Sequence, residues 1–164
     1  LVSKSGLVTI TGGKWTTYRK MGQDVIDQAV QVAGLEERPC RTEELRIHGW
    51  LKNYDVADPL HFYGTDALGI QKLMMSDARL AEKLHPNLPY VAAEVVWAVR
   101  EEMARTVEDV LSRRTRALLL DARAAAAAAP AVAALMAEEM GKDEAWQRRQ
   151  AQSFVTLAGE YVLR

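Results

Sequence analysis

The sequence predicts a mainly α-helical protein: a bundle of about seven helices, preceded by one strand and a Gly-Gly-Lys turn. Apolar residues recur at three- and four-residue intervals over most of the chain, with capping residues before these runs and glycines after them. Only one short run, Gly6 to Thr11, has the β-branched composition of a strand. The composition is that of a globular protein, since 49% of the 164 residues are hydrophobic and 26% are charged.

The first elements are a strand, a turn and a helix. The predicted strand "GLVTIT" lies between glycines and is followed by Gly12 and Gly13. From Thr16 onward, apolar and charged residues take opposite sides of a helical period that ends at Gly34. Between residues 35 and 64, prolines and glycines interrupt any helical period, so we expect a loop with one edge strand in "LRIHGWL".

Two short helices are expected after this loop. Thr65 can cap a helix that begins at Asp66, and Ser76 can cap another that carries Leu80 and Leu84.

A longer helical region follows. Residues 90–120 are rich in helix formers and predict two helices meeting near Arg105, because Thr106 and Asp109 form a capping box. Asp121 then caps an alanine-rich helix.

The last two helices have clear ends. Pro130 should kink the alanine-rich helix and Gly141 should end it. Asp143 caps the last helix. Four aromatic residues at helical spacing are expected in the core: Trp97, Trp146, Phe154 and Tyr161. The predicted organisation is a strand-turn-helix segment (1–34), a connector (35–64) and a helical domain (65–164).

Charge and cysteine content exclude several classes of function. Twenty-one basic and 22 acidic side chains give a net charge of -1, which favours neither nucleic acid nor an anionic membrane. The one cysteine, Cys40, forms no internal disulfide, so a reducing compartment is expected. His48, His61 and His85 lack metal-ligand spacing, so no metal site is predicted. No secretory signal opens the chain, and the longest nearly uncharged run, residues 124–137, is too short to span a membrane.

The glycine turn is the main candidate site. A strand, Gly12 and Gly13, then a helix start presents free N–H groups and a positive dipole end to an electron-rich group. Lys14 adds a full charge, and Thr16 and Thr17 can cap the helix or donate hydroxyl groups to a ligand. A plain helix start after a glycine turn is the alternative interpretation.

Two known phosphate-binding motifs do not fit this turn. A P-loop needs a glycine where Val8 stands and a serine or threonine where Trp15 stands. No G-x-G-x-x-G follows the predicted strand. The turn is therefore interpreted as part of a site whose main nucleotide-binding portion lies elsewhere.

Charged clusters further along are expected to be structural. Five arginines between Arg100 and Arg116, including Arg113 and Arg114, stand among four acidic residues and predict an ion-pair network, with a protein contact surface as the alternative. Three nearby glutamates have no nucleophile or histidine beside them, and we expect them to pair with the arginines. They are Glu94, Glu101 and Glu102.

"ITGGKWTTYRKMGQDVID", from Ile10 to Asp27, closely resembles the last flavin-domain segment of FAD-dependent glycerol-3-phosphate dehydrogenases. The resemblance continues, in the family's order, through "YGTDA" at Tyr63, "AEVVWAVREEMARTVEDVLSRRTRALLLDARAA" at Ala93 and "APAVAALMAEEMG" at Ala129. It covers nearly the whole chain and places the helical domain as the family's C-terminal domain.

The resemblance implies the tail of an enzyme of glycerol metabolism that oxidises glycerol 3-phosphate to dihydroxyacetone phosphate. Hydride passes to FAD, and the electrons pass to quinone or, in some relatives, to oxygen. Most of the site belongs to an N-terminal FAD-binding half, so this fragment is expected to bind no FAD and to be inactive. The parent is expected in the cytoplasm or peripherally on the inner face of the cell membrane, with no nucleic-acid partner and with a homodimer left open.

By the same resemblance, Gly12 and Gly13 lie against the flavin, and the helix from Trp15 or Thr16 points its positive end at the pyrimidine carbonyl. Lys14 is assigned to the substrate phosphate or the flavin edge, and Thr17 belongs to the same cofactor-binding turn. A self-standing helical interaction module is the second hypothesis, because 164 residues can bury a core without help.

Overall fold

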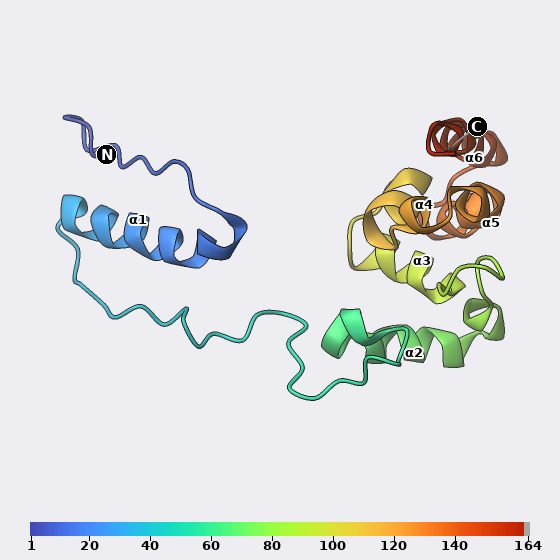
Figure 1. Ribbon diagram of the computed structural model, residues 1–164, viewed down its shortest axis with the longest axis horizontal. Helices are drawn as coiled ribbons and strands as arrows, with labels where there is room; N and C mark the ends of the chain where they lie inside the picture. The colour runs from blue at the N-terminus through green and yellow to red at the C-terminus, as the bar shows by residue number, and fades with distance from the viewer. Residues whose placement is uncertain (163–164) are drawn as a thin grey trace. The chain divides into compact units, whose positions relative to one another are not determined.

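The computed structural model describes residues 1–162 and is mainly helical (Figure 1). The chain divides into two compact units, Leu1–His48 and Gly49–Arg164. This division falls inside the connector expected at residues 35–64.

The first unit contains the predicted amphipathic helix. A 3-10 turn, η1 (Trp15–Thr17), leads into α1 (Tyr18–Ala33), and Gly34 ends it in the left-handed conformation with φ 61°. None of the residues of α1 is buried. The helix and its glycine stop are therefore confirmed, but its apolar side is open.

The strand expected over Gly6 to Thr11 is wrong. The segment is extended, and its only ladder contact in the described residues is one antiparallel bridge between Val2 and Val8. Leu7 and Ile10 remain exposed at 65% and 42%. A strand needs neighbouring strands to pair its backbone groups, and this unit supplies a single bridge in place of a sheet.

The second unit opens with irregular chain and short helices. Residues 49–60 form turns, and the edge strand expected in "LRIHGWL" is absent from the described residues. The 3-10 helix η2 (His61–Asp66) leads into α2 (Ala67–Ser76), which begins one residue later than predicted.

The next predicted helix shrinks to a single 3-10 turn, η3 (Ala78–Ala81). Its cap is Asp77, whose carboxylate accepts the Arg79 N–H at 2.9 Å. Ser76, the predicted cap, instead donates its hydroxyl to the Leu73 carbonyl inside α2.

The helical region of residues 90–120 is more broken than predicted. It contains α3 (Ala92–Arg100), the π-helix η4 (Asp109–Arg114) and the short α4 (Ala117–Leu120). Beyond the end of α3, Met103 takes a left-handed φ of 57°. The predicted capping box is confirmed, because the Asp109 N–H donates to Thr106 Oγ1 and the Thr106 N–H donates to Asp109 Oδ2.

The last two helices form a pair whose ends match the prediction. They are α5 (Ala122–Met140) and α6 (Glu144–Glu160), which make the most extensive contact between elements in this unit (Figure 1). Asp121 and Asp143 cap them through their carboxylates, and Gly141 ends α5 with φ 62°. Pro130 lies inside an unbroken α5.

Helix α3 lies between two hydrophobic clusters. The larger cluster joins α3, η4, α4, α5 and α6, and includes Val95, Leu111 and Phe154. Fully buried alanines of α5 let the helices approach closely. The smaller cluster joins α2 and α3 around Ile70.

Aromatic packing follows the prediction with one exception. Phe154 is buried, and Trp97 and Trp146 pack at the edges of the two clusters. The Trp97 ring occupies the space that a Cβ on Gly69 would need, at 2.3 Å. Tyr161 was expected in the core but is 51% exposed, because it follows the last residue of α6.

Candidate functional site

The glycine turn is shaped by two left-handed residues. Gly12 has φ 82° and Gly13 has φ 94°, which side chains rarely tolerate. A Cβ on Gly13 would lie 2.1 Å from Met21 Sδ, so this glycine also lets α1 approach the turn. A Cβ on Gly12 would meet nothing within 4 Å. The space beside Gly12 is therefore open to a ligand or another part of the protein.

Thr17 holds the turn together from within. The Lys14 N–H donates to Thr17 Oγ1 at 2.9 Å, and the same hydroxyl donates to the Lys14 carbonyl at 2.9 Å. The Thr17 N–H also donates to that carbonyl. Of the two roles expected for Thr17, the structure therefore uses the hydroxyl as a helix cap.

The remaining site residues predicted from the sequence lie together on this turn and are exposed. Lys14 and Thr16 face solvent, and Trp15 is 87% exposed with its ring 5.6 Å from that of Tyr18. No acidic residue lies in the first turn of α1, so its positive end is not compensated there. The turn presents N–H groups and one lysine to whatever approaches it.

The apolar side of α1 continues this open surface. Tyr18, Ile26 and Val32 are exposed at 59%, 61% and 46%. An amphipathic helix gains its stability by burying such a face.

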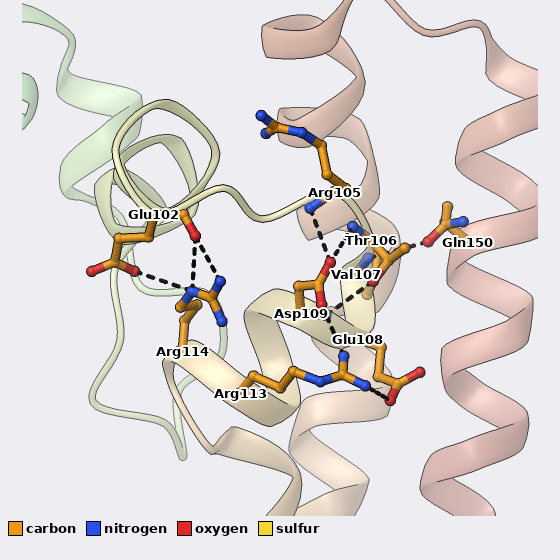
Figure 2. A network of polar contacts seen from close by, with 9 residues as sticks. All are labelled: Glu102, Arg105, Thr106, Val107, Glu108, Asp109, Arg113, Arg114 and Gln150. Carbon is orange, nitrogen blue, oxygen red and sulfur yellow. Dashed lines mark hydrogen bonds and ion pairs between the residues drawn. The ribbon is translucent and has the colours of Figure 1, made fainter. Parts of the chain in front are cut away.

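In the helical unit, Arg113 and Arg114 form ion pairs, as predicted (Figure 2), whereas the Arg105 guanidinium donates to the backbone carbonyls of Val99 and Ala104. Arg113 bonds the carboxylates of Glu108 and Asp109, at 2.5 Å and 2.9 Å. Arg114 donates to the Glu102 carbonyl at 2.6 Å and lies 3.6 Å from its carboxylate. Arg114 therefore ties the π-helix to the segment after α3, while Arg113 bonds the start of the π-helix itself.

Asp109 is the centre of that network. Its Oδ2 accepts the N–H groups of Arg105 and Thr106, both at 3.0 Å. Although burial raises the pKa of Asp109, these hydrogen bonds outweigh it and hold the pKa below the ordinary value. Gln150 of α6 accepts the Val107 N–H at 3.2 Å and ties the same segment to the last helix (Figure 2).

The expectation that Glu94 pairs with arginine is wrong. Glu94 is 2% exposed, and its carboxylate accepts the Val91 N–H at 2.7 Å and the Tyr63 hydroxyl at 3.0 Å. Burial raises its pKa to about 7, and burial likewise raises the pKa of Tyr63. The carboxyl group therefore anchors the "YGTDA" segment to the start of α3.

Only one of the two hydrogen bonds of Glu94 has a signal in the sequence. A glutamate three residues after Val91 is a capping signal, and the structure uses it as one. Tyr63 lies 31 residues away in the sequence, and no periodicity relates the two.

Two features of the described residues bear on membrane and metal binding. Within residues 1–162, no helix has the length and apolar character needed to cross a membrane. The same residues contain no group of three or more His, Cys, Asp or Glu side chains placed to hold a metal ion.

Comparison with known proteins relates nearly the whole chain to one family. A family model described as the C-terminal domain of alpha-glycerophosphate oxidase matches residues 6–147. A probable mitochondrial glycerol-3-phosphate dehydrogenase of Caenorhabditis elegans is 38% identical over 95% of this chain and 25% of its own length. The mitochondrial enzymes of Mesocricetus auratus and Homo sapiens are 37% and 35% identical over 92% and 91% of this chain. No solved structure matches the chain. The chain spans about a quarter of the length of these relatives.

Proposed function

The chain belongs to the family of the C-terminal domain of alpha-glycerophosphate oxidase, and from this premise we propose that it is the C-terminal part of an FAD-dependent glycerol-3-phosphate dehydrogenase. The observation that carries the proposal is the match over residues 6–147, which includes the glycine turn and the helical unit as far as the start of α6. Relatives named glycerol-3-phosphate dehydrogenases align over nine tenths of the chain, from 91% to 95%.

The proposed reaction of the intact enzyme is the oxidation of glycerol 3-phosphate to dihydroxyacetone phosphate. A bound FAD would supply the acceptor for the hydride while the substrate hydroxyl loses its proton, and a quinone would then take up the electrons. Delivery of electrons to a quinone, which lies in the membrane, supports a parent enzyme bound peripherally to the membrane, and we propose its inner face, with the bulk of the enzyme in the cytoplasm. A homodimer is compatible with this arrangement.

The turn at the start of α1 fits the electron-rich edge of a flavin. Gly12 leaves open space where a ring can approach the backbone, and Gly13 allows the close packing that shapes the turn. The helix start at Trp15 and Thr16 adds a positive dipole end without an acidic side chain beside it. This dipole stabilises the negative charge that reduction places on the bound ring.

Lys14 is the substrate-binding residue that we propose. It is exposed beside the helix start, and its ammonium group bonds the substrate phosphate or the flavin edge as a charged donor. Thr17 contributes by holding the Lys14 backbone in place through its hydroxyl.

The domain assignment follows from the same proposal. Residues 1–34 are the last segment of the FAD-binding domain, 35–64 are a connector and 65–164 form the C-terminal helical domain. The isolated chain is then inactive, because one turn and one lysine are only a small part of a site for so large a cofactor.

The decisive experiment uses the full-length parent protein. We expect it to copurify with FAD, and glycerol 3-phosphate to bleach the flavin absorbance and support reduction of a soluble quinone. This chain alone should show neither property. A full-length protein with no G-x-G-x-x-G upstream and no bound flavin would refute the proposal.

A self-standing helical interaction module is the second candidate. It is favoured by one observation: the second unit buries its own core around Val95, Leu111 and Phe154. The same experiment separates the two, because an interaction module has no reason to carry a flavin.

A further inference from the structure

The second unit carries an unusual concentration of exposed apolar side chains at its start. Six lie within residues 50–68, with exposed fractions from 41% to 72%: Trp50, Leu51, Tyr54, Val56, Phe62 and Leu68. Among the later described residues, the exposed large apolar side chains are Met75, Met103, Leu119, Leu120, Val155 and Tyr161. The helices from α3 onward therefore turn a mostly polar surface to solvent, whereas the segment before them does not.

Three of these side chains, together with His61, form one feature, which we call the aromatic hollow. Leu51, Tyr54, His61 and Phe62, with Gly49 and Gly64, line a depression of about 280 Å³. Tyr54 stacks on His61 with ring centres 6.3 Å apart, and Phe62 meets His61 edge-on at 5.7 Å. Contiguous exposed patches of this kind mark protein contact sites.

Local hydrogen bonds fix the walls of the aromatic hollow. The carboxylates of Asp55 and Asp58 accept the N–H groups of Ala57 and Leu60, both at 2.9 Å. The His61 ring bonds the Asp58 carbonyl through Nδ1 at 2.7 Å. Asp55 and Asp58 beside the hollow are thus engaged in its own turns.

The floor of the hollow is attached to the helical core. The Thr65 N–H donates to the Gly49 carbonyl at 3.2 Å. A Cβ on Gly64 would lie 1.8 Å from that oxygen. The two backbone segments therefore approach more closely than a residue with a side chain at position 64 would allow. Tyr63 then bonds the buried Glu94 of α3. A preformed surface of this kind binds a partner with little loss of entropy.

From this geometry we infer that the aromatic hollow is the surface through which the helical unit docks on the flavin-binding part of the parent enzyme, receiving an apolar side chain or segment from it. The inference rests on the proposed function. Its occupant follows from length, because the chain covers only 25% and 23% of the first two relatives, so most of such a protein lies outside this chain. Rigid aromatic side chains are the usual anchors of such contacts.

Hydroxyl-radical footprinting of side chains tests the inference without mutation. We expect Tyr54 and Phe62 to be oxidised about five-fold or more slowly in the full-length holoenzyme than in this chain, because docking removes them from solvent. Tyr161, 51% exposed against 60% for Tyr54, is the matched control and should react equally in both proteins. Equal oxidation of Tyr54 and Phe62 in the two proteins would overturn the inference.

Two further arms identify the occupant. Protection that appears only when anionic lipid vesicles are added would assign the hollow to the membrane and overturn the inference. Protection that grows with the concentration of this chain alone would assign it to a second copy, with the same consequence. Flavin content is measured on the same full-length sample, so a failure of the proposed function is recognised separately from a failure to find protection.

A pair of variants provides the energetic test. Phe62→Ser should lower the unfolding midpoint of the holoenzyme by on the order of 2 °C, because it removes a buried apolar contact from a large protein. It should change the unfolding of this chain less, since Phe62 is already 54% exposed here. Leu120→Ser, at 64% exposed, is the control and should change neither protein. Equal midpoints for the Phe62 and Leu120 variants of the holoenzyme would contradict the proposed contact.

Discussion

At the scale of single residues, Glu94 and Lys14 show that burial decides what an ionisable side chain can do. Glu94 is a carboxyl group withdrawn from water and bonded to Tyr63 and Val91. Lys14 is an ammonium group left exposed at the start of a helix. Burial decides the difference, because a buried charge must be neutralised or bonded, whereas an exposed charge remains available to a ligand.

Glu94 should make stability depend on pH. Its pKa is about 7 in the folded protein against the ordinary 4.5, so the folded state binds the proton more tightly than the unfolded state. The contribution is therefore fully present below pH 4.5 and is lost as the pH rises through about 7. The loss is on the order of 3 kcal/mol. We expect Glu94→Gln to remove this decline, because the amide stays neutral: its oxygen can accept the Val91 N–H, and its NH2 group can donate to the Tyr63 hydroxyl oxygen.

Urea unfolding followed by circular dichroism at several pH values between about 4.5 and 8 measures this effect. Glu101→Gln is the matched control, since Glu101 lies seven residues along the chain and is exposed. The pH dependence of this control should match that of the unaltered chain. Parallel stability curves for the unaltered chain and Glu94→Gln would show that the buried carboxyl group does not control the decline.

Lys14 is tested in the full-length enzyme. Lys14→Ala should lower kcat/KM for glycerol 3-phosphate by about ten- to a thousand-fold, because a charged contact is lost while the fold is retained. Lys20→Ala is the control, since Lys20 lies on α1 and is paired with Asp24 at 2.8 Å. Steady-state kinetics with quinone as acceptor gives the answer, and unchanged constants for Lys14→Ala would remove this residue from the site.

At the scale of elements, local signals predicted far more than long-range ones. Helix starts at Asp121 and Asp143 and stops at Gly34 and Gly141 were predictable, because a cap acts within four residues of itself. The strand at residues 6–11 was not, because a strand exists only when another segment pairs with it.

The candidate site shows the same division. The turn, its left-handed glycines and the Thr17 cap lie within six consecutive residues and were visible in the sequence. The contact between Tyr63 and Glu94 depends on how the chain folds back onto α3, and so does the aromatic hollow. Local sequence patterns do not predict such long-range contacts. The ligand groups that the turn is proposed to face lie outside this chain altogether.

Hydrogen exchange should separate the elements by stability. Amides of Leu7 to Thr11 are expected to exchange near the unfolded rate, because this exposed segment has a single bridge to Val2. Amides of Val95 to Val99 in α3 should be protected by most of the global stability, because α3 lies between both hydrophobic clusters. Strong protection of residues 7–11 in dilute monomer would show that the segment has a stable place within this chain.

At the scale of the whole molecule, the two units differ in what they can do alone. The helical unit encloses two hydrophobic clusters and satisfies its buried charges. The first unit has no buried residue in α1, and its glycine turn is exposed. The helical unit thus supplies its own core, whereas α1 and the glycine turn have none within theirs.

This difference leads to the last prediction, that the chain alone binds no FAD at micromolar concentrations. Cofactor sites normally bury most of the ligand surface, whereas the turn at residues 12–17 offers one exposed edge. Its few N–H groups and one lysine cannot offset the entropy lost when so large a ligand is held. Equilibrium dialysis against FAD, with the full-length enzyme as the positive control, measures this directly. A yellow preparation of this chain that keeps its flavin through dialysis would mean that residues 1–48 hold far more of the cofactor site than the turn alone provides.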